Sequence, residues 1–256
     1  MNKQLLYILI ALIILLISII YNNYNTESFD NENNIVIVIS RYNENLEWLK
    51  EEPFNKYPVI IYNKGPNDEY YKPDKLIKTE NIKNVGREGH TYLYYIIQNY
   101  NNLYNINIFL PGSANMEKKM PHCKKLIEHI EKNNKSIFLS NKISLNDLYN
   151  FQLDNYSSTS QENNSINPEN NLELSEIRPF GKWYEDKFKN IELNYVTYGG
   201  MFSISKEDII HHPIQYYKNL IKYLENSSNP EVGHYFERAW EAVFYPMNNT
   251  LKIKEL

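Results

Sequence analysis

Charged and amide side chains gather in the segment Ser40-Arg41-Tyr42-Asn43-Glu44. The guanidinium of Arg41 could pair with a phosphate, since its planar shape matches the oxygens of that group. Asn43 and Glu44 could hydrogen-bond a ribose or a base. The same two residues could instead begin a helix, with Asn43 as its N-cap and Glu44 in its first turn. Arg41 is therefore the strongest substrate-binding candidate of this segment.

A second group lies in the segment NVGREGHT, residues 84–91, which opens a predicted helix. The free N–H groups of a helix start, together with Arg87, offer a place for an anionic group, and Glu88 could contact the same ligand. His90 could be catalytic, although a lone histidine is more often structural. The segment is neither a G-x-G-x-x-G dinucleotide pattern nor a P-loop, so it suggests phosphate binding without specifying a nucleotide.

A third group lies on the predicted helix that follows Pro230. His234, Glu237, Arg238 and Glu241 are spaced by three or four residues and share one polar stripe. A carboxylate there could act as a general base, and His234 and Arg238 could contact a substrate. Alternatively, the stripe is a solvated helix face with internal salt bridges, which is the interpretation that periodicity alone favours.

Glycine is scarce, and all eight glycines lie in six short segments rich in polar and aromatic residues. These segments are YNKG, NVGREGHTY, LPGS, PFGKWY, YGGMFSIS and EVGHYFERAWE. Glycine permits backbone conformations and close approaches that other residues do not, so the clustering favours functional turns. The alternative is that any α/β fold needs a few tight turns.

Motifs for metal binding or for a nucleophile are missing. The six histidines form no H-E-x-x-H arrangement, and no D-x-D triplet occurs. Cys123 is the only cysteine, which excludes an intrachain disulfide and a cysteine-based zinc cluster. No G-x-S-x-G nucleophile elbow is present. We predict no metal site and no resident cofactor, and we leave a divalent cation open.

Alternating strands and helices are predicted to position these groups. The run IVIVI over residues 35–39 is β-branched and not alternating, which is typical of a strand buried on both faces of a mainly parallel sheet. Further strands are predicted over 59–62, 106–110 and 136–139, and helices over 86–100 and 123–132. The pattern predicts an α/β fold with a mainly parallel or mixed sheet and helices on both faces.

Helix starts are predicted from capping residues. Asn43, Ser205 and Asn229 are the expected N-caps. Because Arg41 ends a strand and Arg87 opens a helix that leads to the next strand, parallel connectivity places both at the carboxyl edge of the sheet. We expect the polar stripe of the last helix to face the same cleft.

One domain is predicted over residues 35–256. Residues 150–175 are rich in Asn, Ser and Glu, which indicates a mobile low-complexity insertion. The net charge of −4 and the absence of basic runs exclude a protein built to bind nucleic acid.

The segment over residues 1–21 is predicted to be a membrane anchor. Leu5–Tyr21 carries no charge, and its helix is long enough to cross or nearly cross a bilayer. A cleavable signal peptide is the alternative, but the bulky residues at the end of the segment favour a retained anchor. A polar stem over residues 22–34 follows. Lys3 before the segment and acidic residues after it predict a single-pass protein whose domain is luminal or extracellular.

Six segments together resemble an uncharacterised domain family of fungal and large-DNA-virus proteins. They are IVIVISRYNENLEWL, VIIYNKG, NVGREGHTYLYYIIQNY, INIFLPGS, GGMFSISKEDIIHHPIQYY and EVGHYFERAWEAVF. That family is in turn similar to the glycosyltransferase-A fold in the order of its parts. The resemblance implies a transferase that moves a sugar from a sugar nucleotide to a glycan, protein or lipid acceptor at a membrane.

The sequence departs from that fold at the metal site. Where metal-dependent members carry D-x-D, this chain has Leu110-Pro111-Gly112-Ser113. The resemblance therefore implies a metal-independent enzyme in which Arg41, Arg87 or Arg238 neutralises the leaving diphosphate. It also implies Glu231 or Glu237 as the base and YGGMFSIS as the acceptor side. The alternative is a non-catalytic glycan-binding or structural membrane protein of the same fold.

Overall fold

The computed structural model describes residue 13 and residues 34–142, 144–153, 172–189, 191, 195–248 and 250–255. Apart from residues 13 and 34, the predicted anchor and stem lie outside these ranges. Within the described ranges, no helix is both long enough and apolar enough to cross a bilayer. Ile35–Leu256 forms one unit by its internal contacts.

A mixed sheet forms the centre of this unit. Its strands are β1 (Ile35–Arg41), β2 (Val59–Asn63), β3 (Leu76–Asn81), β4 (Ile106–Pro111), β5 (Ser136–Lys142), β7 (Tyr195–Ser205) and β9 (Thr250–Glu255). Among the described residues they take the order β3-β2-β1-β4-β7-β5-β9. The first four strands are mutually parallel, whereas β7 is antiparallel to both of its neighbours. The predicted mainly parallel or mixed α/β sheet is confirmed.

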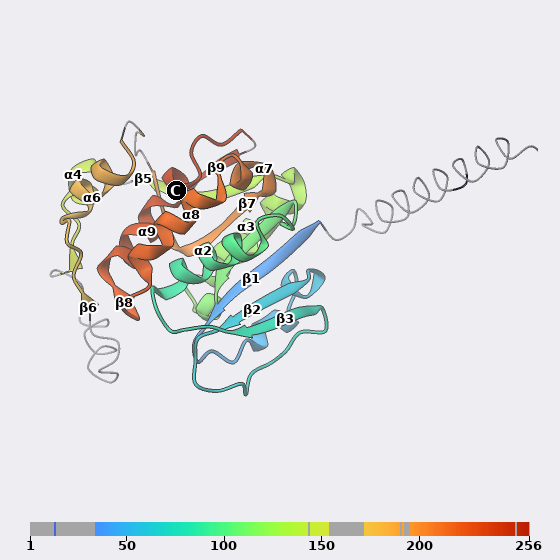
Figure 1. Cartoon of the computed structure of the whole chain (residues 1–256). Helices are drawn as coiled ribbons and strands as arrows, with labels where there is room; N and C mark the ends of the chain where they lie inside the picture. Colours follow the sequence, from blue (N-terminus) through green and yellow to red (C-terminus); the bar gives the residue numbers. More distant parts are fainter. Residues whose placement is uncertain are drawn as a thin grey trace, which may run out of the picture. The chain divides into compact units, whose positions relative to one another are not determined.

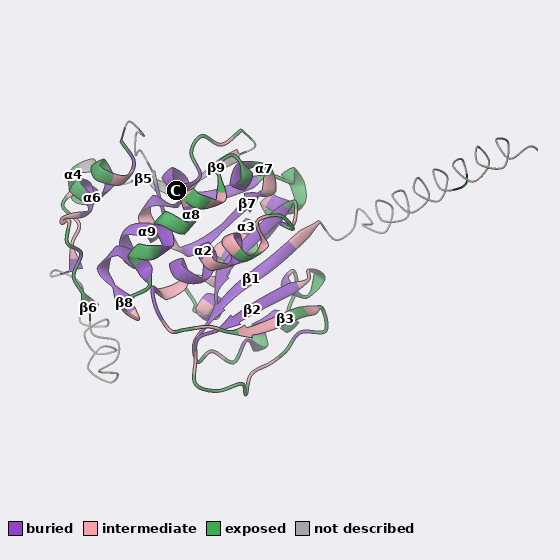
Figure 2. Ribbon diagram, viewed as in Figure 1, coloured by how far each residue is buried: buried purple, intermediate pink, exposed green. Residues whose placement is uncertain are grey.

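Helices cover both faces of the sheet. One face carries α2 (Arg87–Asn99), α6 (Phe180–Lys187), α8 (Ile214–Ile221) and α9 (Glu231–Val243), and the other carries η1 (Glu47–Lys50), η2 (Phe54–Lys56) and α3 (Met120–Asn133). Figure 1 shows α2, α8 and α9 side by side. In β1, Val36 and Val38 face the first core while Ile37 and Ile39 face the second. Both faces of β1 are therefore buried, as its apolar run predicts (Figure 2).

Short elements complete the described fold. They are η3 (Gly112–Asn115), α4 (Leu145–Tyr149), α7 (Lys206–Ile210), η6 (Lys222–Leu224) and the two-stranded pair β6 (Leu172–Glu173) and β8 (Asn229–Pro230).

Two of the three predicted N-caps are wrong. The Ser205 side chain accepts a hydrogen bond from the backbone N–H of Asp208 at 3.1 Å and caps α7 as predicted. After Asn43, by contrast, the chain forms the two 3-10 turns η1 and η2, and the residue before η1 is Leu46. The last helix is preceded by Pro230, because Asn229 pairs with β6 instead of capping.

Both ends of the predicted insertion are anchored to α9. The backbone N–H groups of Leu153 and Ser175 donate to the two carboxylate oxygens of Glu231, at 3.0 and 2.9 Å. Residues 154–171 lie outside the described residues. The predicted insertion over residues 150–175 therefore has described flanks that belong to the folded unit, and its mobility stays a prediction.

The strand order creates a crevice between β1 and β4. The chain adds β2 and β3 on one side of β1, then crosses over through α2 and adds β4 on the other side. The connections that leave the carboxyl ends of β1 and β4 therefore run in opposite directions. Such a switch point is where open α/β sheets bind ligands.

Candidate functional site

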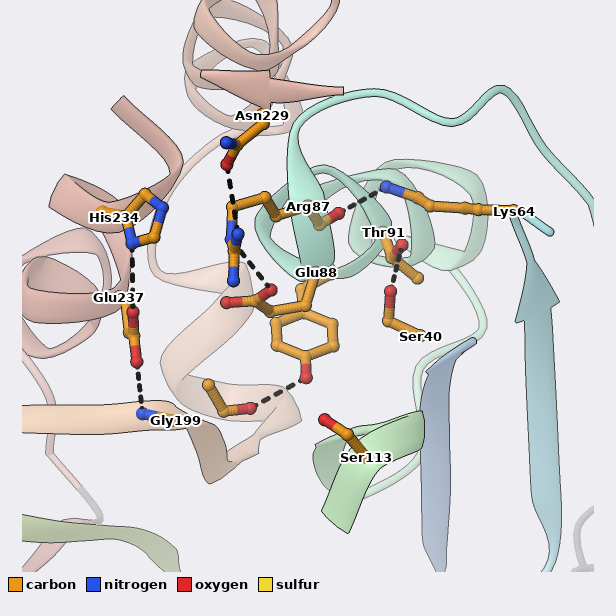
Figure 3. Close-up of polar contacts among 12 residues, drawn as sticks. Ser40, Lys64, Arg87, Glu88, Thr91, Ser113, Gly199, Asn229, His234 and Glu237 are labelled. Carbon is orange, nitrogen blue, oxygen red and sulfur yellow. Dashed lines mark hydrogen bonds and ion pairs between the residues drawn. The ribbon is translucent and has the colours of Figure 1, made fainter. Parts of the chain in front are cut away.

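A pocket of about 330 Å³ lies at this switch point. Its walls come from the carboxyl ends of β1, β2 and β4, the start of α2, the middle of β7 and the polar side of α9. Figure 3 shows most of the polar side chains that surround it. The lining residues are Ser40, Arg41, Tyr42, Glu44, Lys64, Asn84, Arg87, Glu88, Pro111, Ser113, Lys119, Gly199 and Glu237. We call this space the switch-point pocket. Segments far apart in the sequence therefore converge on one site. Of the side chains predicted to meet there, the pocket is lined by Arg41, Arg87, Glu88 and Glu237 but not by His90, His234 or Arg238.

Arg87 enters the pocket from an unusual backbone turn. Both Gly86 and Arg87 have positive φ, 60° and 51°. A side chain at residue 86 would collide with Leu224, so only glycine fits there. Residue 87 holds a conformation that costs a non-glycine residue of the order of 1 kcal/mol. The fold therefore tolerates local strain to direct Arg87 toward the pocket.

The guanidinium of Arg87 is held in place by neutral and charged partners. Its Nη1 donates to the side-chain oxygen of Asn229 at 3.1 Å, and its Nε lies 3.7 Å from a carboxylate oxygen of Glu88 (Figure 3). A Cβ at Gly233 on α9 would lie 3.2 Å from the Arg87 side chain. Because 38% of the side chain is exposed, Arg87 can bind an anion without leaving these partners.

Two more glycines make room for carboxylates of the pocket. A Cβ at Gly200 would lie 2.8 Å from the Cγ of Glu88, and a Cβ at Gly112 would lie 2.6 Å from a carboxylate oxygen of Glu44. Together with Gly233 beside Arg87, three of the scarce glycines thus lie directly against charged side chains of one pocket. The prediction that glycine clusters at functional turns gains a physical reason here.

Glu237 is a carboxylate of the pocket whose surroundings favour proton binding. Its side chain is 17% exposed and accepts the backbone N–H of Gly199 at 2.5 Å. Burial raises the pKa of this carboxyl, and the nearby charge of Glu88 raises it further, against the opposing effect of the arginines at 87 and 238. A carboxylate with a raised pKa that faces a pocket binds a proton more strongly than a free carboxylate, which suits a general base.

His234 and Arg238 lie behind Glu237 and do not line the pocket. The imidazole Nδ1 of His234 and Nη1 of Arg238 each lie 3.9 Å from a carboxylate oxygen of Glu237. Arg238 stacks on the ring of Phe151 at 3.5 Å and donates to the carbonyl of His234 at 2.8 Å. Burial, with two nearby arginines, lowers the pKa of His234 and keeps its ring neutral. The structure places both residues beside Glu237 and not in the lining of the pocket, and their predicted substrate contacts stay a prediction.

Arg41 lines the pocket, but acceptors of the protein itself hold its guanidinium. Its guanidinium is buried and donates to five acceptors, which belong to the loops over residues 42–44 and 63–67. It also stacks on the ring of Tyr70 at 3.9 Å. With most of its donors used within the protein, Arg41 organises the wall of the pocket, and its role as a phosphate ligand stays a prediction.

Glu44 lines the pocket, whereas Asn43 is exposed outside it. The carboxylate of Glu44 accepts the backbone N–H groups of Tyr42 and Asn43 at 2.7 and 3.1 Å. It lies against Gly112 at the end of β4, the place where the sequence itself offers no acid. The predicted ligand role of Asn43 is therefore not supported, while Glu44 remains at the site.

His90 and Glu231 lie outside the switch-point pocket. The ring of His90 is stacked 6.0 Å from that of Tyr94, and burial, with Lys64 nearby, lowers its pKa to about 3. Glu231 is fully buried, and besides the two N–H groups described above it pairs with Arg178 at 2.7 Å. Neither residue lines the pocket, and the predictions that they are catalytic stay predictions.

Two lysines of the pocket were missed by sequence reasoning. The ammonium of Lys64 donates to the carbonyls of Val85 and Arg87, on either side of the strained turn. Burial lowers the pKa of Lys64 to about 7. Lys119 donates to the hydroxyl of Ser113 at 2.9 Å. The only sequence signal was the YNKG turn at the end of β2, which marks Lys64; nothing in the sequence marks Lys119.

The described residues contain no preformed cluster of metal ligands. Among the residues that the structure describes, no three His, Cys, Asp or Glu side chains are grouped so that they could hold a metal ion. The basic residues that line the pocket are Arg41, Lys64, Arg87 and Lys119.

Residues 36–254 match a family described as protein of unknown function (DUF3431). The chain therefore belongs to the DUF3431 family. The predicted relation to a family of unknown function is confirmed. A comparison with curated proteins finds no match.

Several solved structures are similar to this DUF3431 chain. One is core-mannan synthase A (CmsA/Ktr4) from Aspergillus fumigatus in its Mn/GDP form, with 13% identity and a TM-score of 0.41 over 88% of this chain and 73% of that one. Another is CMP:2-keto-3-deoxy-manno-octonic acid synthetase complexed with CTP, with 12% identity and a TM-score of 0.38 over 86% and 90% of the two chains. The mannosyltransferase Ktr4p from S. cerevisiae in complex with GDP has 14% identity and a TM-score of 0.36, over 82% of this chain and 64% of its own.

Proposed function

We propose that this DUF3431 protein is a sugar-nucleotide-dependent glycosyltransferase and that the switch-point pocket is its donor site. The observation that carries the proposal is the placement of Glu237. Its buried carboxylate, with a raised pKa, faces a pocket that also presents the cationic side chains of Arg87 and Lys119. A proton acceptor beside anion-binding groups is what a transfer from a diphosphate donor to a hydroxyl requires.

The reaction uses these groups in sequence. Arg87 and Lys119 bind oxygens of the donor diphosphate, and Glu237 accepts the proton of the acceptor hydroxyl. The bond from the acceptor oxygen to the anomeric carbon forms, and the bond from that carbon to the phosphate oxygen breaks. The electron pair leaves with the nucleoside diphosphate, whose charge Arg87 stabilises in the transition state. The acceptor class is a hydroxyl of a glycan, a protein or a lipid.

In this proposal Arg87 and Lys119 neutralise the charge of the donor diphosphate, so the transfer needs no metal ion. The missing D-x-D needs no replacement acid, because Arg87 and Lys119 line the same pocket as Pro111 at the end of β4. Nucleotide binding should then persist in EDTA. If binding requires Mn²⁺ or Mg²⁺, a cation held by Glu44 or Glu88 neutralises the diphosphate instead.

A thermal-shift screen of nucleoside diphosphates and sugar nucleotides tests the proposal. A ligand that binds the native state raises the apparent stability by mass action. Arg87→Lys should reduce the shift, because it keeps the charge and loses the planar fork. Lys218→Ala is the matched control, since Lys218 is exposed on α8 and lines no described pocket. If no nucleotide shifts the transition, the alternative of a non-catalytic glycan-binding or structural protein is favoured.

We also propose that residues 1–21 anchor the protein in a membrane as a single-pass segment with the domain on the luminal or extracellular side. The proposal is supported by the uncharged apolar run over Leu5–Tyr21 and by Lys3 before it. Protease protection of the domain in sealed vesicles tests the orientation, and digestion from the cytoplasmic side would reverse it.

A further inference from the structure

A second pocket of about 280 Å³ adjoins the switch-point pocket. It is lined by Lys118, Lys119, His122, Leu139, Tyr198, Gly199 and Met201. Lys119 and Gly199 line both pockets, so the two spaces share part of their walls. We call the second space the side pocket.

The lining of the side pocket combines apolar walls with basic residues. Leu139 and Met201 are only 4% and 6% exposed and form the walls, together with the half-buried ring of Tyr198. Lys118 is exposed at the end of the pocket that leads to α3, and Lys119 lies next to it. No Asp or Glu is among the described lining residues. Such a surface complements a ligand that has an apolar body next to a negative charge.

Glu237 lies where the two pockets meet. Its carboxylate accepts the backbone N–H of Gly199, the residue that both pockets share. Gly199 has a φ of +78°, and a Cβ there would lie 2.7 Å from the terminal carbon of Met201. A side chain at residue 199 would therefore intrude where the pockets join. The geometry lets a hydroxyl held in the side pocket approach Glu237 on its way to a donor in the switch-point pocket.

We propose that the side pocket binds the acceptor and that this acceptor carries an alkyl or aryl group next to an anionic group. The inference rests on the proposed function, because it assigns the second substrate of the same site. Leu139, Tyr198 and Met201 contact the apolar group, and Lys118 contacts the anion, while Lys119 binds the donor diphosphate. The acceptor hydroxyl then projects toward Glu237.

Calorimetric titration of the purified full-length protein with ethyl, butyl and hexyl phosphate tests the side pocket directly. Each added methylene that becomes buried should strengthen binding by about fourfold. Hexylammonium and hexanol are the controls for charge, and both should bind more weakly than hexyl phosphate. Equal affinities across the series, or equal binding of hexylammonium, would overturn the proposal.

Two variants locate the binding. Lys118→Glu should weaken the binding of hexyl phosphate by about tenfold, because an attraction to the anion becomes a repulsion. Lys218→Glu makes the same charge change on exposed α8 and should have no effect. Leu139→Gln should flatten the dependence on chain length. If Leu139→Gln fails to fold, the wild-type series and Lys118→Glu still decide the matter.

Donor binding is followed in the same preparations, so the two proposals can fail separately. If hexyl phosphate binds in the switch-point pocket instead, Arg87→Ala will weaken its binding and Lys118→Glu will not. That result would overturn the side-pocket assignment. If hexyl phosphate depends on Lys118 but no nucleotide binds, the side pocket stands as a ligand site and the transferase proposal falls. If nucleotides bind and no alkyl phosphate does, only the acceptor assignment is overturned.

Discussion

Replacement of Lys64 by methionine tests how the switch-point pocket is built. The Lys64 ammonium donates to the carbonyls of Val85 and Arg87 and so holds the turn that directs Arg87. Methionine keeps the unbranched shape of the side chain and is one atom shorter, and it has no titrating group and no donor. Lys64→Met leaves two carbonyls without their partner, at a cost of about 1–3 kcal/mol each, and it removes the penalty of burying a charge. The two effects oppose each other, so the pH dependence is the diagnostic quantity.

The size of that pH dependence follows from the pKa of Lys64. Burial lowers it from 10.5 to about 7, so the unfolded chain binds more protons than the folded chain between these values. The free energy of unfolding therefore rises with pH in this window, by about 1.4 kcal/mol per pH unit. Roughly two units of the window lie between pH 6 and pH 9, which makes the contribution of Lys64 about 3 kcal/mol.

Urea denaturation of the full-length wild type and Lys64→Met between pH 6 and pH 9 measures this contribution. The stability of the wild type should gain about 3 kcal/mol over the variant as pH rises, because the other titrating groups cancel in the difference. Lys218→Met, at an exposed lysine, should run parallel to the wild type. Parallel curves for Lys64→Met as well would show that Lys64 is not buried as described and would refute the reasoning.

Three further predictions concern the site and the chain ends. Gly233→Val should weaken nucleotide binding by roughly tenfold, since even a Cβ lies 3.2 Å from Arg87, and a titration in which it binds like the wild type would contradict the geometry. Replacing residues 154–171 by a Gly-Ser linker should leave the melting temperature unchanged, because the segment has too few apolar residues to offset its ordering entropy; a large decrease would show a structural role. The full-length chain should stay in the membrane pellet after alkaline carbonate extraction, and its release into the supernatant would disprove the anchor over Leu5–Tyr21.

Buried elements of the fold could be predicted from the sequence, whereas its edges could not. The run IVIVI predicts β1 because a strand covered on both faces must be apolar throughout. The edge strands β3, with the sequence LIKTEN, and β9, with TLKIKE, were missed. Their lysines and glutamates are typical of strands that border solvent, so neither strand has the continuous apolar run that marks a central one.

Site residues could be predicted only as far as chain connectivity places them. Arg87 and Glu88 follow from the start of the helix between two parallel strands, and the structure brings both into the pocket. Arg41 ends the right strand, yet the sequence does not show that its donors are used by neighbouring loops. Lys64 was missed for the converse reason, since the carbonyls that hold its ammonium, those of Val85 and Arg87, lie 21 and 23 residues further along the chain. The outcome depends on partners that lie distant in sequence.

Release of nucleoside diphosphate from the sugar nucleotide found in the thermal-shift screen tests the central claim most directly. The assay compares the full-length wild type with Glu237→Gln, which keeps the shape of the side chain and removes its basicity. The account predicts turnover by the wild type and a decrease of at least about 100-fold in kcat for Glu237→Gln, with donor affinity little changed. Equal turnover by both proteins, or binding of the donor without any turnover, would contradict it.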